Sequence, residues 1–408
     1  MSASWATHQT LLAAVRRSGR ARSLRAALLV APAVAFLAIV FLVPIIGFML
    51  RSVDNSEVPE ALPRTSVTLA DWNREGLPNE AAFSSLILDL RALDGASAAA
   101  LARRLNYSRI GLRTLILKTR ASADAIEPEK ARAALPALDP QWENRDVWGT
   151  LRNESSALTP FFLLAALDLS RDAAGAIHPS RDGALYREVF LRTFGISAAV
   201  TSFCVLLGMP LAFYLAAAPT KVASLVLALV LLPFWTSVLV RTTAWVILLQ
   251  GQGLVNQLLL GLGLIAAPAK LIFNRIGVYV AMTHVMLPFF VLPLYGVMRR
   301  VPREHLRAAA SLGAPPLLVF RKVYLPQILP GVMAGALLVF VTSLGYYITP
   351  ALVGGPSDQM VSYFVGFFTN ESVNWGMAAA LGSLLLAAVV GIYVALAGPA
   401  NINPARTV

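Results

Sequence analysis

The chain consists of long apolar runs separated by short polar loops, with one polar block near the N-terminus. A helix that crosses a bilayer needs about 20 apolar residues, because the hydrocarbon is about 30 Å thick. Six runs reach that length: residues 26–50, 193–218, 222–249, 276–298, 329–353 and 375–397. The pattern therefore predicts an all-α integral membrane protein with six transmembrane helices.

Residues 251–269 are also apolar, but they include Gln252, Asn256, Gln257, four glycines and Pro268. We predict an outer loop with a short interfacial helix here. A seventh span would move the basic cluster at residues 299–322 to the outside of the membrane. Lys and Arg favour the cytoplasmic side, which argues against that topology.

Residues 51–188 form the polar block, which holds 19 of the 22 acidic and 17 of the 34 basic residues. We expect a largely helical, extracytoplasmic insert between the first and second spans. Leu86, Leu90 and Leu93 recur at helical spacing. The following Asp94–Gly95 pair should break that helix, and Ser97 is the expected cap of the next one.

The rest of the insert gives weaker signals. Residues 110–118 fit a helix or a strand, residues 128–135 fit a short helix begun by proline, and residues 157–167 are too short to span a membrane. Without cysteine, the insert must be held by a helical core or by docking on the membrane helices. It is either an embellishment with no direct role or a docking surface for an extracytoplasmic partner.

Composition narrows the class of protein. The chain is 57% hydrophobic, carries a formal net charge of +12 and has one cysteine. These values exclude a disordered chain, a disulfide framework and a cysteine-rich metal site. The basic residues outside the insert lie mainly in loops that six spans place on one side, so we expect no nucleic-acid partner. On the cytoplasmic side we place Arg16, Arg17, Arg20, Arg22, Arg25, Lys221, Arg299, Arg300, Arg303, Arg307, Arg321, Lys322 and Arg406.

The expected organisation follows from these positions. Residues 1–25 are a basic cytoplasmic N-terminus, 26–50 the first helix, 51–188 the insert, 189–398 a core with five helices and 399–408 a cytoplasmic tail. We predict a multi-pass protein of the cell inner (plasma) membrane in contact with lipid, with both termini in the cytoplasm.

One loop has a distinctive order of helix formers and breakers. Between the fourth and fifth spans, residues 304–312 predict a short helix that Gly313 ends, as a left-handed position favours glycine. Residues 316–322 predict a second short helix, which Pro326 should stop. We name residues 299–331 the coupling loop, for the resemblance given next.

This loop resembles that of ABC-importer permeases, whose pattern is Glu-Ala-Ala, three residues, Gly, nine residues, Ile-x-Leu-Pro. The alanine, glycine and final positions are filled at the right spacing, whereas Arg307 replaces the usual Glu. The residues concerned are Glu304 in the first turn, then Arg307, Ala308, Ala309, Gly313, Val323, Leu325 and Pro326.

Further segments resemble the spermidine/putrescine branch of this family. They are residues 232–245, 251–256, 287–295, 345–355 and 374–378, within a resemblance that covers about residues 191–397 and the first span. The resemblance implies six helices of the type I ABC importer permease kind. It also implies a homologous second permease subunit, two cytoplasmic ATPase subunits and a periplasmic solute-binding protein as partners.

The chain has no phosphate-binding Gly-x-x-x-x-Gly-Lys-[Ser/Thr] loop and no nucleophile–base or metal-ligand set. We therefore expect no catalytic residue, metal or cofactor in this chain, and ATP only on the partner subunits. The function that the resemblance implies is ATP-driven import of a small solute, with a polyamine such as spermidine or putrescine as the first choice.

Several side chains are candidates for the translocation pathway. Arg241 is the one formally charged residue inside a predicted span, and His284 is the one histidine there. A charge in hydrocarbon is costly, so Arg241 should face a cavity, a partner or the outer interface. Cation–π contact with a solute is possible at Trp235, Trp245, Tyr346 and Tyr347. The alternative for each is helix packing or an interfacial belt.

Asp358 and Glu371 flank the outer ends of the last two spans and are candidates for contact with the binding protein or a cationic solute; ordinary loop solvation is the alternative. Three other readings of the chain compete with the polyamine importer. The first is the same machinery with another small organic or inorganic solute. The second is a secondary transporter or channel without ATP, against which the absence of acidic residues in the spans argues. The third is a receptor or scaffold that acts through the insert.

Overall fold

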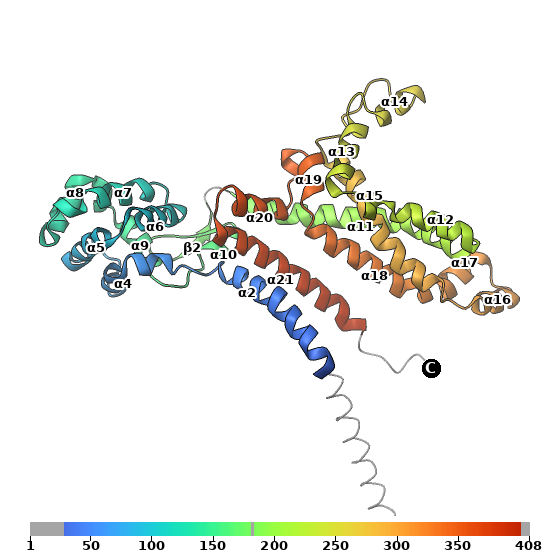
Figure 1. Cartoon of the computed structure of the whole chain (residues 1–408), viewed down its shortest axis with the longest axis horizontal. Coiled ribbons are helices and arrows are strands. Elements are labelled where there is room, and N and C mark those ends of the chain that lie inside the picture. Colours follow the sequence, from blue (N-terminus) through green and yellow to red (C-terminus); the bar gives the residue numbers. More distant parts are fainter. Residues whose placement is uncertain (1–27, 181–182, 401–408) are drawn as a thin grey trace, which may run out of the picture.

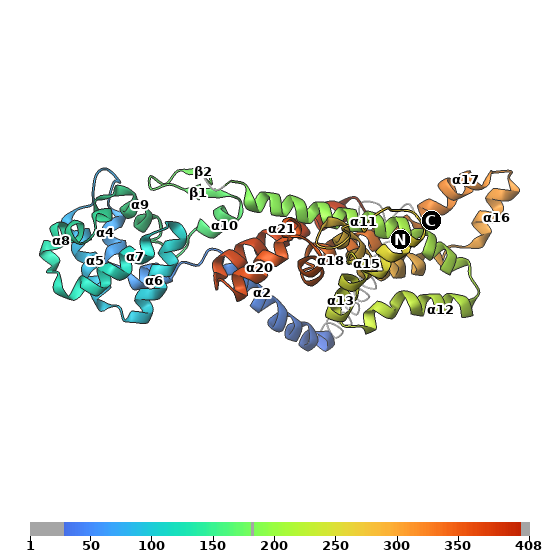
Figure 2. The same ribbon diagram turned by 90° about the horizontal axis from the view of Figure 1, so that it is seen from above.

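The computed structural model describes residues 28–180 and 183–400, with side chains described up to residue 395. The basic N-terminus expected at residues 1–25 and residues 401–408 of the expected tail lie outside the described residues. Figures 1 and 2 show an elongated molecule in which the insert and the coupling loop lie at opposite ends, with long helices between them. Within the described residues, six helices are long and apolar enough to cross a membrane.

The insert is helical, as expected. Its α-helices are α3 (Glu57–Ala61), α4 (Pro63–Ala70), α5 (Glu80–Ala92), α6 (Gly95–Ser108), α7 (Leu112–Ser122), α8 (Ala131–Leu138), α9 (Arg145–Asn153) and α10 (Phe161–Ala166). Short 3-10 turns occupy Ala123–Ala125, Pro128–Lys130 and Pro140–Glu143. The antiparallel strands β1 (Leu169–Arg171) and β2 (Ile177–Pro179) pair Ser170 with His178.

The insert has its own hydrophobic core, centred on Phe83, Trp142 and Trp148. The Trp142 and Trp148 rings lie 5.2 Å apart, and each indole N–H has a buried acceptor, Thr119 Oγ1 at 3.0 Å and the Trp142 carbonyl at 3.0 Å. Burying these rings removes a large apolar area from water, while the hydrogen bonds satisfy their polar ends. The core forms without cysteine.

Details of the insert correct the expected cap of one helix and decide between the two alternatives for another segment. The cap of α6 is Asp94, whose Oδ1 accepts a hydrogen bond from the Ser97 N–H at 2.7 Å; Ser97 is therefore inside the helix and is not its cap. Residues 112–122 form helix α7 and not a strand. The long helix α11 begins at Leu185, so the last residues of the predicted insert already belong to it.

A neck joins the insert to the membrane helices. The chain leaving the first helix pairs with the returning chain, because Asn55 N donates to the Ala157 carbonyl (2.9 Å) and Thr159 N to the Val53 carbonyl (2.9 Å). Helix α10 then packs on α21 (Trp375–Ala400), where the Phe162 ring lies against Gly376 so closely that a Cβ there would clash. The insert thus combines both predicted means of support, a helical core and docking on a membrane helix.

The centre of the bundle is α11 (Leu185–Ala217), α15 (Arg275–Met298) and α18 (Leu325–Leu344). Phe290 of α15 lies between two glycines, Gly208 of α11 and Gly335 of α18. A Cβ at Gly335 would lie 2.8 Å from the Phe290 carbonyl oxygen. The glycines therefore allow the helix backbones to approach closely, as is common in membrane bundles.

The first, second, fourth and sixth predicted spans correspond to single helices, Leu28–Leu50, Leu185–Ala217, Arg275–Met298 and Trp375–Ala395. The first includes a π-helical turn at Ala38–Leu42 before α2 (Val43–Leu50). The expected third span, residues 222–249, is wrong as a single helix. It is divided into α12 (Thr220–Leu231), which continues as a 3-10 turn to Trp235, and α13 (Val238–Leu249).

Helix α14 (Leu254–Gly261) is the short helix expected after residue 250. The apolar helical run that is long enough to span is Val238–Gly261, which combines α13 and α14. Asn256 organises the following loop, since its amide donates to the carbonyls of Gln250 and Ala269 at 2.9 and 3.0 Å.

The fifth span is displaced toward the coupling loop relative to the prediction. The helical run is Pro316–Leu344, and Pro326, expected to stop a helix, instead lies in the first turn of α18, where proline is tolerated. After Leu344 the chain breaks into α19 (Ile348–Val353), followed by α20 (Val361–Asn370), a helix that was not predicted.

Candidate functional site

The coupling loop begins with α16 (Arg303–Ser311), which ends at a left-handed glycine. Gly313 has φ of +81°, and the N–H groups of Leu312, Gly313 and Ala314 donate to the carbonyls of the last turn. The predicted helix and its glycine stop are confirmed. A non-glycine residue would strain the backbone here, although no other atom lies within 4 Å of a Cβ.

The second part of the loop, α17 (Pro316–Val319), continues through a π-helical segment, Phe320–Tyr324, into α18. This continuous helical run contains Val323, Leu325 and Pro326. The His305 ring Nδ1 and Gln327 Oε1 are 3.1 Å apart, so α16 is fixed against the start of α18. The two short helices are thus held in one arrangement.

The surface of α16 is open. None of its residues is buried, and Glu304, Arg307 and Ala308 are exposed while Ala309 is partly covered. At the tip, Leu312 is 88% exposed and Leu317 is 77% exposed. Apolar side chains this exposed, beside small alanines, make a surface suited to another protein.

A cavity of about 750 Å³ lies behind α16, between the ends of α11, α12 and α15. Arg299, Arg303 and Arg307 line it, together with apolar residues such as Phe213 and Leu306. Within the described residues, no carboxylate lies within ion-pair distance of Arg307. The site therefore has a positive rim, unlike a site with the usual Glu at this position.

The candidate pathway residues fall into separate groups. The break between α12 and α13 places Trp235 at its edge, 75% exposed, and Arg241 one turn into α13. Arg241 Nη2 donates to the Thr236 carbonyl at 3.2 Å. This bond satisfies a carbonyl that the break leaves free, which is a helix-stabilising role for the arginine.

Trp245 and His284 are brought together. The Trp245 indole N–H donates to His284 Nδ1 at 3.2 Å, and the rings meet edge to face at 5.4 Å. Both side chains retain some exposure. The pair therefore joins α13 to α15 at a surface that a solute could reach.

Tyr346 and Tyr347 occupy the break after α18 and contact α20. The Ser362 hydroxyl donates to the Tyr346 carbonyl at 2.7 Å, and the Tyr347 ring lies 6.2 Å from that of Tyr363. Tyr347 is 43% exposed. These tyrosines form a group distinct from Trp245 and His284.

The Asp358 carboxylate is buried and already paired within the protein, so the expected contact with the binding protein or a cationic solute is wrong for this residue. It is 3% exposed, pairs with Arg275 at 3.0 Å and accepts the Gly355 N–H at 3.2 Å. Glu371 is exposed at the end of α20. Of the two acidic candidates, only Glu371 lies where a binding protein could touch it.

Sequence reasoning did not anticipate the arginines that hold the segment around Asp358. Arg192 donates to the carbonyls of Ser357 (2.7 Å) and Gln359 (2.9 Å), and Arg275 pairs with Asp358. The loop after α19 is therefore fixed to α11 and α15. A lone acid within a long uncharged run was the available signal, because such an acid needs a partner when buried.

The comparisons with known proteins agree with this architecture. The family described as binding-protein-dependent transport system inner membrane component matches residues 193–400. The spermidine/putrescine transport system permease protein PotB of Escherichia coli is 34% identical over 210 residues, covering 52% of this chain and 76% of the relative.

Two further relatives are comparably similar over the same core. The inner membrane ABC transporter permease protein YdcU of Escherichia coli is 33% identical over 224 residues, covering 51% of this chain and 70% of the relative. The molybdenum transport system permease protein ModB of Mycobacterium bovis is 34% identical over 198 residues, covering 48% and 73%. The family match begins after the insert. The match and the relatives show that the chain belongs to the binding-protein-dependent inner-membrane transport components and is a multi-pass permease subunit of an ABC importer.

Proposed function

We propose that this permease carries a polyamine such as spermidine or putrescine. The observation that supports this choice is the 34% identity, over 76% of its length, to a permease named for spermidine and putrescine transport. The open Trp245–His284 pair and the exposed Tyr347 offer aromatic faces that attract cations. With Trp235, Arg241 and Tyr346 they are the proposed pathway residues.

The test is uptake of labelled spermidine by cells that lack the gene, complemented with wild-type protein or with Trp245→Leu. We expect wild type to restore uptake and unlabelled putrescine to compete. Trp245→Leu should raise KM severalfold. Trp72→Leu is the control, because Trp72 belongs to the core of the insert, and it should leave KM unchanged. Uptake that is unaffected by loss of the gene would overturn the substrate assignment.

A second candidate substrate is a small oxyanion. The relative named for molybdenum transport is 34% identical, and Arg241 is a cation within an apolar segment, which suits an anion better than a polyamine. Labelled molybdate in the same cells separates the two. Molybdate uptake without spermidine uptake would replace the first proposal by the second and leave the importer assignment intact.

The coupling loop is proposed to dock on the ATPase subunits. The arrangement has two cytoplasmic ATPases, a homologous second permease and a periplasmic binding protein, with ATP bound and hydrolysed only on the partners. The exposed Leu312 and Leu317 beside α16 support this docking face. Glu304, Arg307, Ala308, Ala309 and Gly313 form it, and Val323, Leu325 and Pro326 transmit its movement to α18.

The docking test replaces an exposed apolar side chain by a charged one. Leu312→Asp should abolish copurification of the ATPase and reduce uptake, because a carboxylate would be desolvated in the contact. Ile110→Asp is the matched control, since Ile110 is 92% exposed on the insert. Normal ATPase recruitment by Leu312→Asp would contradict the proposed face.

A further inference from the structure

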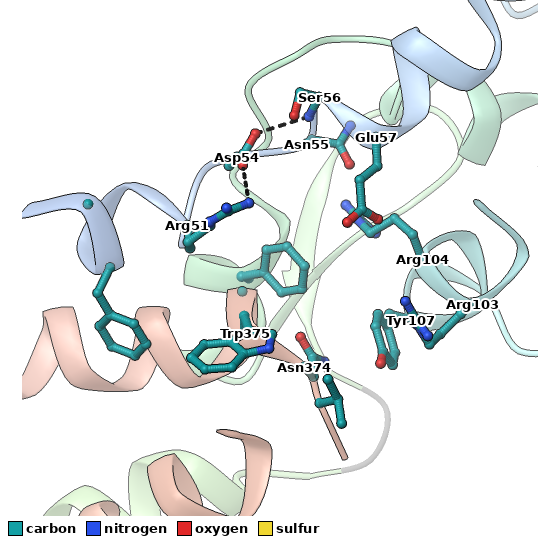
Figure 3. A pocket seen from close by; sticks show the side chains of 15 residues that line it. Arg51, Asp54, Asn55, Ser56, Glu57, Arg103, Arg104, Tyr107, Asn374 and Trp375 are labelled. Carbon is teal, nitrogen blue, oxygen red and sulfur yellow. Dashed lines mark hydrogen bonds and ion pairs between the residues drawn. The ribbon is translucent and has the colours of Figure 1, made fainter. Parts of the chain in front are cut away.

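A second cavity, of about 690 Å³, lies where the insert meets the membrane helices. Its walls come from the end of α2, the neck, α6, α10 and the start of α21 (Figure 3). It lies at the opposite end of the molecule from the coupling loop. The transport machinery described above does not use it.

The charges around this cavity are of both signs, and most are already paired within the protein. Arg51 pairs with Asp54 at 3.1 Å, and Arg104 pairs with Glu154 at 2.7 Å while its guanidinium lies 4.8 Å from the centre of the Phe162 ring. Two exposed charges remain, Glu57 on α3 and Arg103 on α6. In the described part of the chain neither has an ion-pair partner within 4 Å, so one acidic and one basic group are free to meet a ligand.

Two buried polar atoms of the cavity wall also lack protein partners. Asn55 is 2% exposed and its Nδ2 donates to the carbonyls of Glu154 (2.7 Å) and Ser156 (2.8 Å), which fixes the amide while Oδ1 has no donor. Arg104 is 5% exposed, and its Nε has no acceptor. Unpaired buried polar groups are costly and uncommon. Both atoms lie beneath the surface of the wall, which is therefore polar below its exposed charges.

Electrostatics agree with this mixed character. Burial lowers the pKa of Arg104, whereas Glu154 and then Glu57 act to raise it. Burial would raise the pKa of Asp54, but hydrogen bonds from Ser56, together with Arg51, lower it. With the Arg104–Glu154 and Arg51–Asp54 pairs, the cavity is lined by charges of both signs.

The cavity's position indicates the source of its ligand. It lies where the apolar helix Leu28–Leu50 ends and where α21 begins, which is the boundary between hydrocarbon and water. Trp375 and Phe48 meet there edge to face at 6.5 Å, and Tyr107 lines the same wall. Trp and Tyr favour this boundary. The apolar side chains of the first helix, such as Phe41 and Ile46, are exposed and can contact acyl chains.

We propose that this cavity binds the headgroup of a zwitterionic phospholipid with a primary amine, of the phosphatidylethanolamine type. The phosphate meets Arg103, which can form charge-assisted hydrogen bonds to phosphate oxygens. The ammonium meets the exposed carboxylate of Glu57, and the acyl chains of the lipid lie along the first helix. The lipid thus joins the insert to the membrane on the side where the insert lies.

The test is native mass spectrometry of the full-length protein, titrated with phosphatidylethanolamine, phosphatidylcholine or phosphatidylglycerol. We expect phosphatidylethanolamine to bind at least tenfold more tightly, because choline has no N–H to donate and the glycerol headgroup has no ammonium. The double variant Glu57→Gln/Arg103→Gln should lose this preference. The matched control is Glu129→Gln/Arg113→Gln, which removes the same charges from exposed positions elsewhere on the insert.

Two further measurements keep the result decisive. Equal melting temperatures of the two double variants show that lost binding is not unfolding. Soluble glycerophosphoethanolamine and spermidine serve as competitors. Neither should displace the lipid when it is present at the same concentration as the lipid. Three results would each overturn the proposal. They are equal affinity for the three lipids, unchanged binding by the cavity variant, and displacement of the lipid by either soluble competitor at the concentration of the lipid. The outcome is independent of which solute the permease carries.

Discussion

At the scale of single residues, Gly313 sets the shape of the coupling loop. Its φ of +81° costs an alanine about 1–2 kcal/mol, while the surroundings leave room for a side chain. Gly313→Ala should therefore loosen the end of α16 and lower uptake without changing the melting temperature of the bundle. Gly313→Asn is the matched variant, because asparagine tolerates this conformation, and it should retain more activity. Equal uptake by both variants and wild type would contradict this role.

The glycines beside Phe290 make a different prediction. Gly335→Ala places a Cβ 2.8 Å from the Phe290 carbonyl oxygen, so α15 and α18 must separate. We expect a loss of about 1–3 kcal/mol, typical of overpacking. The measurement is thermal unfolding in detergent. Gly296→Ala is the control, since that exposed position on α15 has open space, and it should not lower the melting temperature.

Asp358 and Glu371 are predicted to respond differently to substitution, because Asp358 is buried and Glu371 is exposed. Asp358→Asn removes the buried carboxylate that binds half-exposed Arg275 and the Gly355 N–H, and it should destabilise the segment after α19, because hydrogen bonds to a charged acceptor are the stronger ones. Glu371→Gln alters an exposed side chain and should leave the melting temperature unchanged. Hydrogen exchange of residues 354–361 measures the effect, and equal protection in both variants would argue against the structural role of Asp358.

At the scale of elements, helix caps and turns of the insert predict an acid sensitivity. A hydrogen bond from the Ser97 N–H lowers the pKa of Asp94, and bonds from the Gln141 and Ala176 N–H groups lower the pKa of Asp139 and Asp172. A carboxyl with a lowered folded-state pKa stabilises the fold above its unfolded value, near 3.8, and loses that contribution as pH falls.

Hydrogen exchange of the full chain between pH 7 and pH 3 checks this prediction. Protection in α6 should fall as the pH drops below about 4, after correction for the intrinsic exchange rate. Asp94→Asn retains a capping oxygen but does not titrate, so the protection of its α6 should vary less with pH. An identical pH profile in the variant would show that Asp94 does not contribute.

The length of apolar runs predicted most of the membrane helices but not their breaks. Residues 222–249 are mostly apolar, and membrane helices tolerate proline, so the hydropathy of this segment does not distinguish one helix from two. The break depends on Arg241 bonding the Thr236 carbonyl and on Thr242 meeting Thr349 of α19 at 3.1 Å. Likewise, the Arg275–Asp358 pair joins residues far apart in sequence, which local patterns do not show. Gly313 was predictable because its signal is local.

At the scale of the whole molecule, the separation of insert and coupling loop predicts their accessibility from the two sides of the membrane. Long helices lie between these parts (Figure 1). The coupling loop has six basic residues and one acidic residue, whereas the insert has 17 basic and 19 acidic residues, so the positive-inside tendency assigns the coupling loop to the cytoplasm. The single native thiol, Cys204, is buried, so added cysteines can be read without background.

A membrane-impermeant maleimide applied to intact spheroplasts should therefore label Arg113→Cys, on the exposed surface of α7, and should not label Ser311→Cys at the end of α16. After the membrane is permeabilised, both variants should react, because both positions are exposed. That second step shows that a lack of labelling reflects sidedness and not burial. Labelling of Ser311→Cys alone in intact spheroplasts would reverse the topology, and the coupling loop could then no longer meet a cytoplasmic ATPase.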